Sequence, residues 1–164
     1  MDATQFYRRL FDYDLWANRA ALESVAALSA LNTSGAERAR KTLTHVIGAQ
    51  RIWLSRFETP EHPNVEPWPA LSLDECRAAV EDLYRGWTGL VNRLGPEKLA
   101  QDLVYRNTKG VEFRTPISDV LMHLVIHSAY HRGQVAAAVR EAGVKPASTD
   151  YVVWTRQVQS QVSS

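Results

Sequence analysis

Apolar residues recur every three or four positions through most of the chain, which is the spacing of one face of an α-helix. This pattern predicts four main helices and a short fifth one near the C-terminus. The predicted ranges are about Thr4–Leu28, Ser34–Glu58, Leu73–Leu94, Pro116–Ala142 and Tyr151–Val158. Strict alternation of apolar and polar residues, the pattern of a half-buried strand, is nearly absent.

Capping residues mark where four of these helices should begin. Ser34 and Ser72 each precede a glutamate by three positions, which is the spacing of a capping box. Thr115 stands directly before Pro116, an arrangement typical of an N-cap followed by proline at the first helical position. Asp150 is the expected cap of the last helix.

Helix-breaking residues separate the predicted helices. Four prolines between residues 60 and 69 indicate a connecting loop, Gly95–Pro96 ends the third helix, and Gly143 ends the fourth. Around the turn-forming Asn107–Gly110, the segments Val104–Arg106 and Val111–Phe113 are predicted to pair as a small hairpin. The expected fold is therefore all-α, a four-helix bundle with a small hairpin before helix four and a short C-terminal helix.

Length and composition agree with one globular domain spanning residues 1–164. The chain has 45% hydrophobic and 23% charged residues, enough to bury a core and typical of neither disordered nor fibrous proteins. A net charge of +1 provides no basic field for nucleic acid, and no apolar run is long enough for a membrane span or signal peptide. The single cysteine, Cys76, suits a cytoplasmic protein and is interpreted as a small core residue.

Histidine carries the strongest chemical signal. Three of the five histidines, His123, His127 and His131, fall four residues apart in the fourth predicted helix, so they share one stripe that coincides with the apolar, inward face. Buried imidazoles need partners for both nitrogens, which a metal ion or a polar hydrogen-bond network in the core can supply. Both interpretations are open at this point.

Helix geometry limits how the histidines could share an ion. An eight-residue separation corresponds to about 12 Å of helix rise, whereas two nitrogens on one ion lie no more than about 4 Å apart. His123 and His131 therefore cannot bind the same metal, and one pair spaced by four must bind it with a third ligand from elsewhere. His45 in the second helix is preferred to His62 in the proline-rich loop.

Three carboxylates outside the histidine pattern are assigned no catalytic role. Asp14, Asp119 and Glu141 are possible general bases only by charge, and solvated helix-face carboxylates are the simpler interpretation.

The run HSAYHRGQ over residues 127–134, preceded by Leu121-Met122-His123, resembles the helix-four signature of the DinB/YfiT-like family of damage-inducible bundles. Other segments are similar along nearly the whole chain. They are Leu15-Trp16-Ala17-Asn18, His45 followed by Trp53, residues 110–119, and Thr149-Asp150-Tyr151.

The resemblance implies a bundle, often a homodimer, that holds a divalent metal through His45, His127 and His131, with His123 outside the ligand set. Zinc or nickel is the expected ion, with iron as a further candidate. The family includes S-transferases and isomerases that use low-molecular-weight thiols, so the expected function is a metal-dependent transferase or hydrolase acting on a small-molecule substrate. In mycothiol-dependent members a glutamate usually stands where this chain has His127. The alternative is a non-enzymatic metal-binding stress-response bundle.

Overall fold

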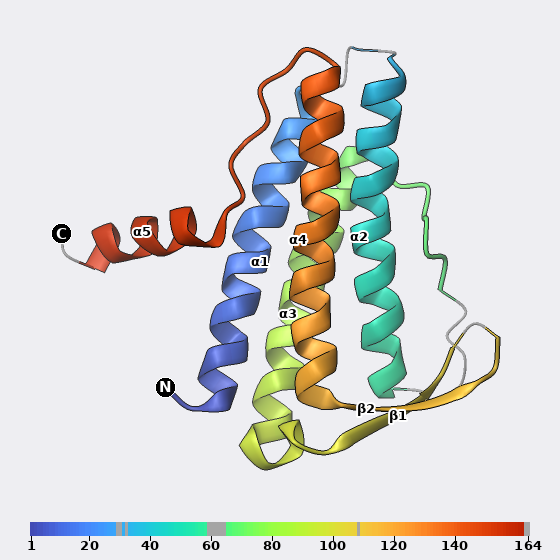
Figure 1. Cartoon of the computed structure of the whole chain (residues 1–164), viewed down its shortest axis with the longest axis vertical. Helices are drawn as coiled ribbons and strands as arrows, with labels where there is room; N and C mark the ends of the chain where they lie inside the picture. The colour runs from blue at the N-terminus through green and yellow to red at the C-terminus, as the bar shows by residue number, and fades with distance from the viewer. Residues whose placement is uncertain (29–30, 32, 59–64, 108, 163–164) are drawn as a thin grey trace.

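The computed structural model describes residues 1–28, 31, 33–58, 65–107 and 109–162, and within them the chain forms a four-helix bundle (Figure 1). The bundle helices are α1 (Ala3–Ala26), α2 (Ser34–Glu58), α3 (Leu73–Leu99) and α4 (Ile117–Glu141). A hairpin of β1 (Asp102–Arg106) and β2 (Glu112–Pro116) precedes α4, and α5 (Tyr151–Val162) follows it. The predicted all-α class, the hairpin and the short C-terminal helix are confirmed.

Helices α1 and α4 run in one direction, and α2 and α3 run in the other (Figure 1). Each helix of one pair contacts both helices of the other. Because α2 and α3 are parallel, the chain between them must return along the length of the bundle. Residues 65–72 do so, climbing beside α2 in Figure 1.

The helix starts agree with two of the predicted caps and differ from two others. Ser72 forms the predicted capping box with Glu75, and the Asp150 carbonyl accepts backbone hydrogen bonds at the start of α5. Ser34 is already helical, and the hydroxyl of the preceding Thr33 accepts the Ala36 N–H at 3.2 Å. Thr115 is not an N-cap either, because it pairs with Leu103 inside the hairpin, and α4 begins without a side-chain cap.

Two helices extend further than predicted. Gly95 adopts φ 67°, a left-handed conformation that glycine tolerates, and a further helical turn follows it to Leu99. Helix α5 runs to Val162 and projects away from the bundle (Figure 1), anchored by Trp154, which is 7% exposed and lies 5.9 Å from the Tyr13 ring. None of the described helices is long and apolar enough to cross a membrane.

A buried ion pair lies at the centre of the bundle. Arg132 on α4 is 1% exposed, and its Nη1 donates to the Asp14 carboxylate on α1 at 2.5 Å and to the Asn18 side-chain oxygen at 2.8 Å. Gln50 on α2 donates to the other Asp14 oxygen at 2.7 Å and to the Ser128 hydroxyl at 2.9 Å. Three helices are thereby joined through one carboxylate. The prediction that Asp14 is solvated is wrong: Asp14 is buried, and the cation that pairs with it lies 118 residues away in the sequence.

We expect Arg132→Met to lower the free energy of unfolding by about 3–5 kcal/mol, since it leaves the Asp14 carboxylate buried without its cation. Urea denaturation followed by circular dichroism measures the change. The matched control is Arg38→Met, which removes an exposed ion pair with Glu141 between α2 and α4 and should lower it by about 1 kcal/mol or less. Equal losses in the two variants would contradict the central role of the buried pair.

Candidate metal centre

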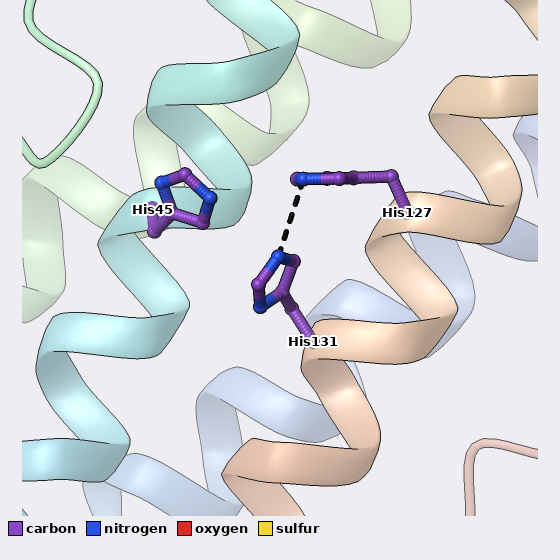
Figure 2. Close-up of side chains that lie close together, drawn as sticks. All are labelled: His45, His127 and His131. Carbon is purple, nitrogen blue, oxygen red and sulfur yellow. Dashed lines mark hydrogen bonds between the residues drawn. The ribbon is translucent and has the colours of Figure 1, made fainter.

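The structure brings three of the predicted histidines together between α2 and α4. His45 projects from α2, and His127 and His131 project from successive turns of α4 toward it (Figure 2). One ring nitrogen from each lies within 4.8 Å of the others. These three residues, the three-histidine cluster, are the set predicted as ligands, and all are half-buried.

Hydrogen bonds fix which nitrogen of His131 faces the cluster. Its Nδ1 lies 2.8 Å from the Gln134 side-chain oxygen, which can only accept, so the proton of a neutral ring resides on Nδ1. The opposite nitrogen, Nε2, then presents a lone pair toward His127 Nε2 at 3.2 Å (Figure 2). Two nitrogens at this distance are held together by a shared proton or by a cation between them.

His45 is oriented by the segment that returns along α2. Its Nδ1 donates to the Pro67 carbonyl at 2.8 Å, which leaves Nε2 unprotonated. The Trp68 ring stacks on the imidazole at a centroid distance of 3.9 Å. Gly48 permits this approach, because a Cβ there would lie 2.6 Å from the Pro67 oxygen. The returning segment therefore sets both the tautomer and the position of His45.

Burial and nearby histidines favour the neutral form of His45 and His127. Desolvation, followed by repulsion from His131, His123 and His45, lowers the pKa of His127 to about 4. Desolvation is also the main cause that lowers the pKa of His45, although its hydrogen bond to Pro67 opposes the shift. Neutral imidazole is the form that binds a metal.

The donor set fits a divalent ion such as zinc. Two nitrogens bound at about 2.0–2.1 Å in a tetrahedral arrangement lie roughly 3.3–3.4 Å apart, close to the separation of His127 and His131. With all three donors within 4.8 Å, the tetrahedral spacing requires at most about 1.5 Å of side-chain adjustment. Hydrogen-bond acceptors behind the rings, as at His45 and His131, are typical of metal-ligating histidines.

His123 lies beside the cluster and outside it, as the helix-rise argument predicts. Its ring centroid is 5.4 Å from that of His127. The histidine stripe is less buried than predicted: Leu124 is 1% exposed, but His123 is exposed and the cluster is half-buried. The stripe therefore lies at the solvent-facing edge of the contact between α2 and α4, and the core position is taken by Arg132 and Ser128.

The remaining candidates fall outside the site. Asp119 and Glu141 are exposed, as predicted, and neither belongs to the cluster. Cys76 is 1% exposed, and burial raises the pKa of its thiol, so it is a core residue. His62 lies outside the described residues.

Sequence reasoning missed the residues that orient the ligands. Pro67 acts through a backbone carbonyl, which leaves no signature in the sequence. Gln134 and Arg132 are part of the HSAYHRGQ run, so the run itself was a signal. Its histidines project toward α2, its arginine enters the core, and its glutamine holds His131.

The fold and the site together define the class of protein. It is a helical bundle with a candidate metal site of three histidines between two antiparallel helices. The chain matches the DinB family model over residues 1–161 and belongs to the DinB family. Protein DinB of Bacillus subtilis (strain 168) is 25% identical over 166 aligned residues, covering 90% of this chain and 92% of that relative. No solved structure matches the chain.

Gly48→Ala should release His45 from its fixed tautomer. The added methyl group would collide with the Pro67 backbone and displace the carbonyl that accepts the Nδ1 proton. Long-range 1H–15N NMR of the imidazole nitrogens in the metal-free protein should show Nδ1–H in the wild type and a mixture of tautomers in the variant. Gly133→Ala is the matched control, since a Cβ there meets nothing within 4 Å. Identical His45 spectra in all three proteins would contradict this assignment.

The metal-free protein should lose stability as the pH falls from about 6.5 toward 4. Between these values His127 is protonated in the unfolded chain, where its pKa is near 6.5. In the folded protein it stays unprotonated, because burial lowers the pKa of His127 to about 4. Thermal unfolding in the presence of a chelator measures the effect. His127→Gln should flatten this part of the profile, and an unchanged slope in that variant would contradict the assignment.

Proposed function

We propose that the chain binds one divalent metal ion through His45, His127 and His131 and uses it as a metal-dependent enzyme on a small-molecule substrate. The single observation that carries this proposal is the convergence of three imidazoles within 4.8 Å. Membership of the DinB family supports it. The reaction classes proposed are thiol-dependent S-transfer and hydrolysis.

Residues around the histidines orient them and cover one of their faces. The Pro67 carbonyl and the Gln134 side chain hold His45 and His131 with their Nε2 lone pairs inward. Trp68 covers one face of His45, and its own exposure of 44% leaves it able to contact a ligand at the rim. The half-buried cluster thus combines fixed donors with access from solvent.

An enzymatic role is preferred to a purely structural one because of the number of donors. Among the described histidine, cysteine and acidic residues, the group contains three members, and structural zinc sites normally use four protein ligands. A bound zinc, nickel or iron ion would supply Lewis acidity, which polarises a substrate carbonyl or acidifies a thiol or water. A low-molecular-weight thiol is therefore the proposed co-substrate of the transferase reaction.

The metal content of the purified protein tests the proposal directly. Purified wild-type protein loaded with zinc or nickel and dialysed should retain about one ion per chain, as measured by elemental analysis. His45→Ala, His127→Ala and His131→Ala should each lose most of it while keeping helical circular dichroism, because each removes one of three ligands. His123→Ala and His62→Ala are matched controls and should keep most of the metal. Wild-type metal content in both His127→Ala and His131→Ala would refute the site.

The same proteins separate the enzymatic function from mere metal storage. Metal-loaded wild type is screened with glutathione, bacillithiol and mycothiol against electrophiles, and with ester and amide substrates alone. Turnover that disappears in His127→Ala and persists in His123→Ala supports an enzyme. Stoichiometric metal without turnover in any arm favours the non-enzymatic alternative.

A further inference from the structure

Arg56, in the last turn of α2, is a buried cation without a counter-ion among the described residues. Its residue exposure is 8%, and its Nε has no hydrogen-bond partner in the part of the chain that the structure describes. The guanidinium carbon lies 4.2 Å from the Trp53 ring centroid and 4.6 Å from that of Tyr105, which β1 supplies. The other buried arginine, Arg132, is by contrast paired with Asp14.

This arrangement stabilises the charge only in part. Aromatic rings attract a guanidinium through their electron-rich faces, and the carbonyl end of α2 adds a favourable dipole. Neither provides oxygen acceptors for the guanidinium N–H groups, and burial of an unpaired charge is unfavourable. Desolvation accordingly lowers the pKa of Arg56, with Tyr105 as the opposing influence. An arriving anion would supply the missing acceptors.

A row of ring contacts connects Arg56 to the three-histidine cluster. The Trp53 ring that it covers contacts the His123 ring at a centroid distance of 5.5 Å, and His123 contacts His127 at 5.4 Å. These ring contacts join α2 to α4 and run continuously from Arg56 to the cluster. His123 is exposed, so this row of rings reaches solvent beside Trp53.

We infer that Arg56 binds the oxyanion group, a carboxylate or a phosphate, of a small molecule that binds between α2 and α4 beside His123. The Nε atom is buried, so the guanidinium edge formed by the two Nη atoms presents the paired N–H donors, which match two oxygens of either group. Trp53 and Tyr105 hold this edge in place and leave acceptor oxygens as the missing element. The inference that the same molecule also reaches the metal rests on the proposed function. The inference of an anion site at Arg56 does not depend on that function.

The Arg56 Nε–H signal in a 1H–15N NMR spectrum reports on the site. The full chain is treated with chelator and titrated with inorganic phosphate or with acetate, at constant ionic strength maintained with chloride. A saturable downfield shift of the Arg56 signal is expected, with the signal of Arg51 on the same helix unmoved. The anion that saturates at lower concentration identifies the ligand group as phosphate or carboxylate.

Variants test the same site through a second measurement. The rise in thermal midpoint with anion concentration yields an affinity, which should fall about tenfold or more in Arg56→Lys, because lysine keeps the charge but loses the paired donors. Arg51→Met should behave like the wild type. His127→Ala should lose metal and keep anion binding, so failure of the metal site and failure of the anion site are distinguishable.

Two results would overturn the inference. One is the absence of a saturable shift at Arg56 with either anion in the wild type, which needs no variant to fold. The other is equal weakening in Arg56→Lys and Arg51→Met, which would assign the effect to the general charge of α2.

Discussion

The buried pair of Asp14 and Arg132 determines how α4 is oriented in the bundle. Arg132 and Ser128 lie one turn apart and point inward to the carboxylate of α1 and the amide of Gln50. His131 and His127 each precede one of them by a single position, so they are rotated by about 100° around the same helix. Satisfying the buried charge therefore turns the two imidazoles toward α2. A polar core and a candidate metal site share one helix because neighbouring positions serve different faces.

The parallel arrangement of α2 and α3 has a related effect on His45. A bundle with alternating directions could join these helices by a short turn, whereas this one requires a return segment along α2. That segment passes close enough to Gly48 for the Pro67 carbonyl to accept from His45. The connection thus fixes a ligand that the helix alone would leave free to rotate.

The helices and the three donors could be predicted from the sequence because their signals are local. Apolar spacing, Ser72 and the histidines of α4 act over a few residues. Asp14 was misassigned because its environment depends on a partner 118 residues away. Thr115 carries a helix-capping signal, but pairing with Leu103 across the hairpin takes precedence. The role of Arg56 depends on Tyr105 from the hairpin, a contact that no local pattern reports.

The separation of Asp14 from Arg132 also has a consequence for the order of folding. During synthesis the chain emerges from the N-terminus, so α1, α2 and α3 leave the ribosome before α4. Until Arg132 is available, the carboxylate of Asp14 gains more from water than from burial, which opposes closure of a three-helix intermediate. In an arrangement of three helices without α4, burial of Asp14 would therefore be unfavourable. The same packing of α4 that supplies Arg132 places His127 and His131 opposite His45.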